Sequence, residues 1–272
     1  MKVLKYILAF FLFLGMGLGA WLYYPQYKIN RMKSEAIEAS SDQHKLTYLD
    51  YYRLSSDKDI NHLALGDSII HGYGASETEN LVYKFSSQLG EQLNKSVHYN
   101  NEGINGITST QLNQLVQDGT FDQKIKDADI ITINVGGNDV LKTARHLDYS
   151  QAFNSFEELQ TTFAGNLSAI SSTIEKLNPE ATIIFLELYN PLPLNDQFYT
   201  LADKLLPKWN LKIYEAAQQI PSSIVVQTTK VINGDNIQNI APDGVHPNPN
   251  GYAAITEQML KQFALEYRRQ AV

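Results

Sequence analysis

The stretch His62-Leu63-Ala64-Leu65-Gly66-Asp67-Ser68-Ile69-Ile70-His71-Gly72-Tyr73-Gly74 places a short apolar run directly before a polar, glycine-rich turn. The run over His62–Leu65 predicts a buried β-strand. The turn that follows carries Asp67 and Ser68. A hydroxyl group in this position is well placed for chemistry, because open α/β sheets have their sites at the carboxyl ends of the strands.

From Ile60 onward, short apolar runs alternate with longer amphipathic segments. Four further strands are predicted, at Val97–Asn100, Ile130–Val135, Thr182–Leu188 and Ser223–Gln227. Helices are predicted at Asn80–Leu93, Ser109–Gln117, Phe156–Leu177, Phe198–Ile220 and Asn250–Tyr267. Pro207 is expected to kink or divide the fourth of these helices. The alternation predicts a three-layer α/β/α doubly wound fold with a parallel sheet.

Asp243 and His246, near the end of the chain, join Ser68 as the three groups that a serine hydrolase needs. A serine hydroxyl is a poor nucleophile at neutral pH, so a histidine must take its proton and a carboxylate must hold the histidine in the correct tautomer. The spacing of Asp243 and His246 allows one tight turn to bring the carboxylate to the imidazole Nδ1. By itself the pair is weak evidence, because Asp-x-x-His stretches also occur as solvated turns.

Two segments between these residues strengthen the interpretation: Asn101-Glu102-Gly103-Ile104-Asn105-Gly106-Ile107-Thr108 and Val135-Gly136-Gly137-Asn138-Asp139. Together with residues 66–74 and 243–247, they resemble in order and content the SGNH hydrolases, also called the GDSL esterase/lipase family. The resemblance implies the flavodoxin-like strand order of that fold. It also implies that Ser68 is the nucleophile and that Asp243 and His246 activate it.

The resemblance further implies an oxyanion hole made by the N–H groups of Ser68 and Gly106 and the side-chain amide of Asn138. Gly103 is the runner-up for Gly106. Such donors hold the negative charge of the tetrahedral intermediate, and losing one typically costs about a hundred- to a thousandfold in rate. The alternative treats the glycines as turn residues and Asn138-Asp139 as a helix cap.

Three residues near the expected site need separate comment. Ile70 and Ile107 stand where many family members carry polar residues, which bears on substrate preference because neither position has a catalytic role. His71 is close to Ser68 in sequence, but a neighbour three residues along points away around the turn. We interpret it as a residue at the pocket rim, and His246 as the base.

The composition agrees with one catalytic domain over residues 60–272. The chain has 272 residues, of which 43% are hydrophobic, enough for one sizeable core. The formal net charge of -7 leaves no basic surface, which argues against nucleic acid as a partner. The expected chemistry requires no cofactor, and the histidines are too scattered to suggest a metal site.

Residues 1–24 are expected to be a signal peptide or an uncleaved signal anchor. Lys2 and Lys5 precede an uncharged stretch from Tyr6 to Tyr24, which as a helix would be about 28 Å long, close to the thickness of a bilayer core. Bulky residues from Trp21 onward disfavour cleavage after Ala20. We expect an extracytoplasmic protein, membrane-anchored or secreted, on a bacterial cell surface. Because the chain has no cysteine, a lipoprotein anchor is excluded.

Residues 25–59 are polar and are expected to form a stalk or a partly helical lead-in. Their tyrosines Tyr48, Tyr51 and Tyr52 favour packing on the domain or a place near the membrane surface over glycan binding.

The expected activity is carboxylic ester hydrolysis of the esterase or lipase type, on a small-molecule, lipid or glycan ester. Two alternatives remain open: an O-deacetylase or acyltransferase acting on cell-envelope polysaccharide, and a catalytically inactive module that binds through the same cleft. Residues 188–194, with Phe198 and Tyr199, either wall an acyl pocket or form an ordinary apolar loop.

Overall fold

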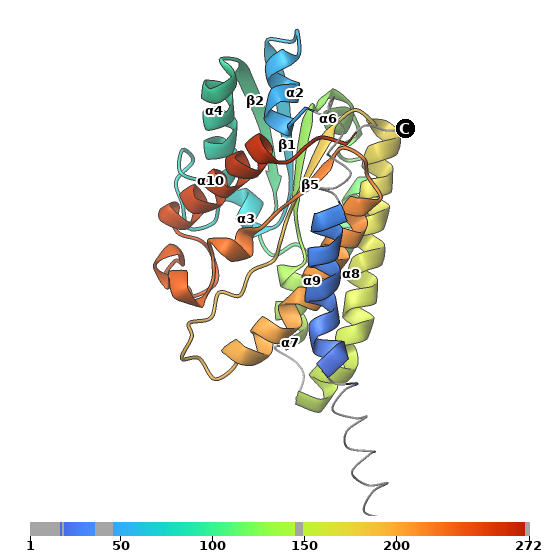
Figure 1. The fold of residues 1–272 in the computed structure, drawn as a ribbon, viewed down its shortest axis with the longest axis vertical. Helices are drawn as coiled ribbons and strands as arrows, with labels where there is room; N and C mark the ends of the chain where they lie inside the picture. The colour runs from blue at the N-terminus through green and yellow to red at the C-terminus, as the bar shows by residue number, and fades with distance from the viewer. Residues whose placement is uncertain (1–16, 18, 36–45, 145–148, 270–272) are drawn as a thin grey trace, which may run out of the picture.

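The structure, a computed structural model, describes residues 17, 19–35, 46–144 and 149–269 (Figure 1). Five strands form one sheet in the order β2-β1-β3-β4-β5, and all neighbouring strands run parallel. Their bounds are β1 Asp59–Gly66, β2 Ser96–Gly103, β3 Ile130–Asn134, β4 Thr182–Leu186 and β5 Ser223–Val226. The parallel α/β sheet predicted from the sequence is confirmed, and its strand order is the flavodoxin-like one.

Helices cover both faces of the sheet (Figure 1). On one face lie α2 (Tyr48–Leu54), α4 (Leu81–Leu93) and α10 (Pro249–Leu265). On the other lie α5 (Ser109–Gln117), α6 (Asp122–Asp127), α8 (Tyr149–Leu177) and α9 (Tyr199–Gln218). The side chains of β3 point alternately to the two faces. Ile130 packs in the core under α2, α4 and α10, whereas Ile131 and Ile133 pack in the core under α5, α6, α8 and α9. This alternation is the period-two pattern of a strand buried on both faces.

Short polar motifs fix where the main helices begin. The Asn80 side chain accepts a hydrogen bond from the Tyr83 N–H at the start of α4. Thr108 and Gln111 form a capping box at the start of α5. Pro249 occupies the first turn of α10, where its missing N–H has no cost. The loops before these helices are therefore held in defined positions.

Pro207 lies inside α9, which continues across it from Tyr199 to Gln218, so the proline does not divide the helix. Trp209 and Leu211, just beyond it, are buried in the core. The packing of these side chains outweighs the cost of about 3 kcal/mol that a proline imposes on a helix interior.

Three short helices were not expected from the sequence: α6, α3 (Ser68–His71) and α7 (Gly137–Ala144). The short helix α2 lies in the segment for which a stalk or a partly helical lead-in was predicted. In addition, 3₁₀ helices occupy Thr228–Lys230 and Gly234–Asn239. Elements of this length show too little hydrophobic periodicity to be recognised in a sequence. Two of them, α3 and α7, directly follow β1 and β3 and carry expected site residues.

Residues 19–35 form a helix, here called the N-terminal helix, that packs on α9. Its Ile29 and Met32 are buried in the same core as α9. At one end, the Lys208 Nζ donates a hydrogen bond to the Trp21 carbonyl at 2.7 Å. Further along, Lys28 pairs with Glu215. Residue numbers rise in the same direction on both helices from the first contact to the second, so the N-terminal helix runs parallel to α9.

The expected lead-in also contributes to the domain through α2. The Tyr48 hydroxyl donates to the Ser223 carbonyl at 2.6 Å, and the Tyr52 hydroxyl donates to Thr182 Oγ1 at 2.8 Å. Both rings are buried. Tyr51 lies under the guanidinium of Arg268, 4.1 Å from the ring centre. These three tyrosines therefore pack on the domain, next to the ends at which β4 and β5 begin.

No helix within the described residues is both long and apolar enough to cross a membrane. The uncharged stretch Tyr6–Tyr24 falls mainly on residues 1–16 and 18, which lie outside the described residues. Its predicted role as a signal peptide or anchor stays a prediction.

Candidate active site

Ser68 is the first residue of α3 and directly follows the turn after β1. Gly66 in this turn has φ +155°, and a Cβ there would lie 2.0 Å from the Asn134 carbonyl oxygen, so only glycine fits. The Asp67 N–H donates to the same carbonyl at 3.0 Å. The Asp67 side chain then caps α3 by accepting from the Ile69 N–H at 2.9 Å. The nucleophile turn is thus fastened to the end of β3.

Asp243 and His246 lie on a tight loop between β5 and α10. The Ala241 N–H donates to the His246 carbonyl at 2.7 Å, and Gly244 takes the left-handed conformation at φ +75°. Asp243 Oδ1 accepts from the N–H groups of Val245 and His246, each at 3.0 Å. The carboxylate is therefore oriented by its own loop before it contacts the imidazole.

The structure brings Ser68, His246 and Asp243 together in one hydrogen-bonded chain. His246 Nδ1 lies 2.6 Å from Asp243 Oδ2, and His246 Nε2 lies 2.8 Å from Ser68 Oγ. With Nδ1–H donating to the carboxylate, Nε2 is free to accept the serine proton, which is the arrangement that a serine hydrolase uses. Ser68 is 9% exposed, so its hydroxyl sits at the bottom of a site that solvent still reaches.

Electrostatics keep the Asp243 carboxylate ionised. Burial by itself would raise the pKa of Asp243. The hydrogen bonds from the Val245 N–H and from the His246 ring and N–H outweigh burial and lower the pKa below its usual value. A negative carboxylate at this position stabilises the imidazolium that forms when His246 takes a proton.

Two tyrosines support the histidine loop, and no sequence motif predicted either contact. The Tyr73 ring lies against the His246 ring with 4.4 Å between centroids. The Tyr189 hydroxyl donates to the Val245 carbonyl at 3.0 Å. Both contacts join segments that are far apart in the chain, so neither hydrophobic periodicity nor local motifs could indicate them.

The expected oxyanion donors come from the segments that follow β1, β2 and β3. The Ile104 N–H donates to the Gly66 carbonyl at 2.9 Å, which joins the loop of Gly106 to the nucleophile turn. Gly106 has φ +76°, and a Cβ there would meet no atom within 4 Å. In the hydrogen bonds between described residues, neither the Ser68 N–H nor the Gly106 N–H is used as a donor. Both remain available to a substrate oxygen.

Asn138 lies in the first turn of α7 and donates its amide to the Ile107 carbonyl at 3.0 Å. An asparagine amide carries two hydrogens, so one remains for an oxyanion. The same loop contact is reinforced by Asp139, which accepts from the Ser109 N–H at 2.9 Å and from the Ser109 hydroxyl at 2.6 Å. Asp139 was part of the quoted motif, but its role in joining α7 to α5 was not expected.

Asp67 is a second acidic residue beside the nucleophile. It is 3% exposed, and burial raises its pKa to about 7, with the nearby Asp139 carboxylate adding to the effect. The hydrogen bond from the Ile69 N–H acts in the opposite direction. Its contacts are those of a cap for α3, in keeping with a role in shaping the turn.

The remaining candidates near the site make structural contacts. His71 is exposed, and its Nδ1 lies 3.2 Å from the Gly103 carbonyl oxygen. The imidazole that contacts Ser68 Oγ is that of His246, as expected. Gly103 closes β2, where a Cβ would lie 2.1 Å from the His71 N atom. Gly103 is therefore needed for close packing of β2 against α3, whereas the open space beside Gly106 suits a donor to substrate.

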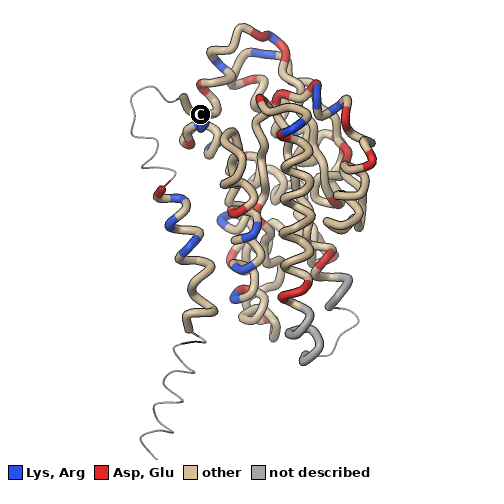
Figure 2. Tube along the Cα trace, turned by 90° about the vertical axis from the view of Figure 1, so that its right-hand side faces the viewer, with Lys and Arg blue, Asp and Glu red and all other residues tan. Residues whose placement is uncertain are grey.

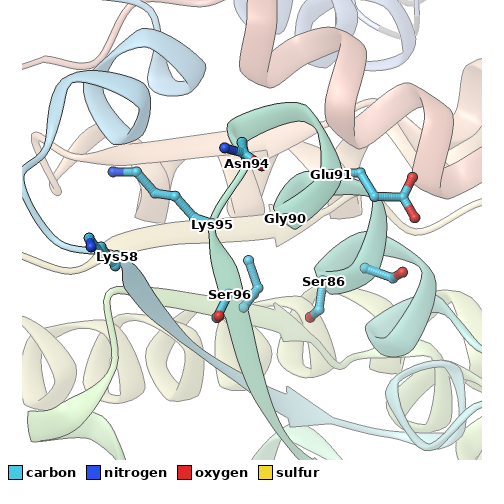
Figure 3. Close-up of a pocket in the computed structure, with 9 residues that line it drawn as sticks. Lys58, Ser86, Gly90, Glu91, Asn94, Lys95 and Ser96 are labelled. Atoms are coloured by element: carbon cyan, nitrogen blue, oxygen red, sulfur yellow. The ribbon is translucent and has the colours of Figure 1, made fainter.

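A separate surface pocket lies between α4 and the start of β2 (Figure 3). Its lining includes Lys58, Glu91 and Lys95. The Lys95 Nζ donates to the carbonyls of Tyr52 and Ser55, so it holds the end of α2. None of the proposed catalytic residues lines this pocket. Among the described residues, no group of three or more acidic or histidine side chains is placed to hold a metal ion.

Residues 64–254 match the model of the GDSL-like Lipase/Acylhydrolase family. The chain therefore belongs to this family, as the resemblance in its four motifs predicted. It is a carboxylic ester hydrolase of the serine type.

Two lipases are among the similar proteins. The spore germination lipase LipC of Bacillus licheniformis is 29% identical over 207 residues, which cover 74% of this chain and 94% of LipC. The crystal structure of the lipase Lip_vut3 from a goat rumen metagenome has a TM-score of 0.66 at 26% identity, covering 75% of this chain and 97% of that one.

A variant of Axe2, an acetyl-xylooligosaccharide esterase from Geobacillus, has a TM-score of 0.58 at 19% identity and covers 78% of this chain and 97% of that one. At this identity the likeness concerns the fold alone.

Proposed function

We propose that this protein is an esterase or lipase that cleaves carboxylic esters through an acyl-enzyme on Ser68. The observation that carries the proposal is the position of the His246 ring between Ser68 Oγ, at 2.8 Å, and Asp243 Oδ2, at 2.6 Å. One imidazole with these two contacts can remove the serine proton and share the resulting positive charge with a carboxylate.

In the proposed mechanism, Ser68 Oγ attacks the ester carbonyl carbon while His246 Nε2 takes its proton. The former carbonyl oxygen becomes negative and is held by the Ser68 and Gly106 N–H groups and by the second hydrogen of the Asn138 amide. The C–O bond to the alcohol then breaks, and His246 returns the proton to the leaving alcohol. Water repeats the two steps on the acyl-enzyme and releases the acid. The protein supplies all of these groups itself.

A fluorophosphonate probe tests the nucleophile directly, because it forms a covalent bond only with an activated serine. We expect the wild type to be labelled, Ser68→Ala to be unlabelled, and Ser76→Ala to be labelled like the wild type. Ser76 is a matched control, since it lies on the loop that follows and its hydroxyl donates a hydrogen bond to Glu79 at 2.6 Å. A wild type that is neither labelled nor active on short-chain p-nitrophenyl esters would identify an inactive binding module.

The similarity to LipC and Lip_vut3 supports a lipid ester as substrate. The alternative, an O-deacetylase or acyltransferase of cell-envelope polysaccharide, uses the same catalytic groups. A series of p-nitrophenyl esters of rising chain length, run beside acetylated polysaccharide, separates the two. Highest kcat/KM at medium or long chains supports the lipase. A maximum at acetyl, with acetate released from the polysaccharide, would favour the deacetylase.

We further propose that residues 1–24 export the protein and anchor it, with the catalytic domain outside the cytoplasm. The support is the basic start at Lys2 and Lys5 and the uncharged stretch that follows. Membrane fractionation and protease treatment of intact cells test this: the full chain should sediment with membranes and be degraded from outside. Recovery in the cytosolic fraction would exclude it.

A further inference from the structure

Large apolar side chains are exposed around the edge of the sheet at which the strands end. Tyr73 follows β1, Ile104 follows β2 and Ile237 follows β5, and each is at least 41% exposed. Tyr73 reaches the catalytic group, because its ring lies against that of His246. These side chains thus begin at the site itself and extend outward from it.

The segments after β3 and β4 continue the pattern. Val140 and Leu141 are exposed on α7, and Leu194, Phe198 and Leu201 are exposed between β4 and the first turn of α9. Each of the five strands is therefore followed by at least one exposed apolar side chain. We call this set the apolar rim. Apolar side chains gathered on one surface mark an interaction site for a protein or a membrane.

The N-terminal helix points to the same end of the molecule. It runs parallel to α9, and its Trp21 contacts Lys208 of α9, close to Asn210, which bonds the Leu188 backbone just after β4. Residues 19–24 therefore lie level with the end of β4, from which the apolar rim extends outward. Figure 1 shows this helix starting at the same end of the molecule as α9. The first turns of the helix carry no charge, and the basic residues follow later (Figure 2). Tyr23 and Tyr24 are exposed on these first turns.

This order of residues is typical of a membrane boundary. Tyrosine and tryptophan are enriched where the hydrocarbon core meets the headgroups, and lysine and arginine lie beyond them. Trp21, Tyr23 and Tyr24 lie at the end of the uncharged stretch, and Lys28 is the first cation after it. A bilayer that held this stretch would have its surface at about residues 21–27, level with the end of β4, from which the apolar rim extends.

We propose that the apolar rim lies on the lipid surface in which the N-terminal segment is anchored, and that the enzyme takes an ester-linked lipid directly from that layer. This inference rests on the proposed ester hydrolysis at Ser68. Contact with lipid removes the rim from water, as for interfacial elements of other proteins. The site then opens into the layer that contains the substrate, and the acyl chain does not have to cross water to reach Ser68.

Site-specific labels test the contact, because the chain has no cysteine of its own. Leu141→Cys and Leu201→Cys place a label on the apolar rim, and Leu54→Cys and Leu265→Cys place one on exposed leucines at the other end of the domain. Each full-length variant is labelled with an environment-sensitive fluorophore and reconstituted into vesicles of phosphatidylethanolamine and phosphatidylglycerol. We expect blue-shifted emission and quenching by spin-labelled lipid at positions 141 and 201 only.

Activity gives an independent readout. Leu141→Gln combined with Leu201→Gln should lower the rate on an ester lipid in the vesicle by about fivefold or more, with the rate on soluble p-nitrophenyl acetate unchanged. Leu54→Gln combined with Leu265→Gln should change neither rate. Both variants replace two exposed leucines by glutamine, and the control pair is the more exposed of the two, so loss of apolar surface alone would affect the control at least as strongly.

Rim labels that are as accessible to water as the control labels, together with unchanged vesicle activity, would overturn the inference. Shielding of the rim without lipid that grows with protein concentration would assign it to a second copy of the chain, and would also overturn it. In both cases wild-type hydrolysis of p-nitrophenyl acetate would leave the proposed ester hydrolysis standing. A wild type inactive on every ester would instead remove the proposed function.

Discussion

The side-chain amide of Asn138 donates a hydrogen bond to the Ile107 carbonyl at 3.0 Å, so the two loops expected to stabilise the oxyanion are joined by a direct contact. Asp139 and Ser109 join them a second time, one residue after Asn138 and two residues after Ile107. The donors are thereby fixed before substrate arrives, and fixed donors do not have to reorganise in the transition state.

Asn138→Ala should lower kcat by about a hundred- to a thousandfold, because one oxyanion donor is lost. KM should change little, since the charge that Asn138 stabilises develops only in the transition state. Steady-state kinetics on a p-nitrophenyl ester measure both. Asn113→Ala, which removes a half-buried amide that donates to Asn166 and is not an expected oxyanion donor, is the control and should remain near wild type. A rate for Asn138→Ala within threefold of wild type would remove Asn138 from the oxyanion hole.

Asp243→Asn should lower kcat by about a thousandfold or more with little effect on folding. The amide cannot accept the Nδ1–H bond in the same way, so it favours the wrong tautomer of His246. Thermal unfolding should stay within a few degrees of the wild type, since Asp243 lies on an exposed loop. The exposed Asp235→Asn is the control. A near-normal rate would mean that another group orients His246.

Gly136→Ala should destabilise the fold by about 1–3 kcal/mol. Gly136 has φ +123°, and a Cβ there would lie 2.7 Å from Phe163 Cε2 and 3.1 Å from Trp209 Nε1. Gly165→Ala is a matched control, because it lies inside α8 with nothing within 4 Å of its Cβ, and should stabilise by about 0.5–1 kcal/mol. Urea unfolding measures both. Equal and small effects would show that the segment after β3 tolerates a side chain.

Asp67 should make the protein less stable as the pH rises. Its carboxyl titrates near 3.8 in the unfolded chain and near 7 in the folded protein. Between these values the folded state holds a proton that the unfolded state has lost, so stability is greatest below about pH 4 and falls as the pH rises towards 7. Asp67→Asn keeps the cap acceptor and removes the titration.

The free energy of unfolding of the wild type, relative to Asp67→Asn, should therefore fall by about 2–4 kcal/mol between pH 4 and pH 8. Urea unfolding at both pH values measures the difference. Asp67→Asn is the control, because every titrating group other than Asp67 is the same in both proteins, and their contributions cancel in the difference. A constant difference would show that the buried carboxyl has an ordinary pKa.

Most of the sheet could be predicted because its strands are nearly continuous apolar runs. Ile130–Asn134 and Thr182–Leu186 are buried at every position, and such runs differ clearly from amphipathic helices. The expected site residues could be placed from motifs because each follows a strand. What could not be predicted depends on contacts across the fold. Nothing near Tyr73 in the sequence indicates His246, and nothing near Asp139 indicates Ser109.

The N-terminal helix is a further case. Ile29 and Met32 lie three residues apart among polar neighbours, too little apolar surface to predict a buried helix. The helix is held in place by contacts with α9: Lys28 pairs with Glu215, and Ile29 and Met32 pack in the same core as the apolar side chains of α9.

The residues that pack the N-terminal helix on α9 are distinct from the segment proposed to export and anchor the enzyme. Ile29 and Met32, which pack in the core with α9, come after Ala20, the residue after which a signal peptidase would cut. If residues 1–24 anchor the protein as proposed, removal of everything before Trp21 would release it from the membrane and keep the buried contacts of Ile29 and Met32. A single cut could thus convert a tethered enzyme into a diffusing one with the same catalytic centre.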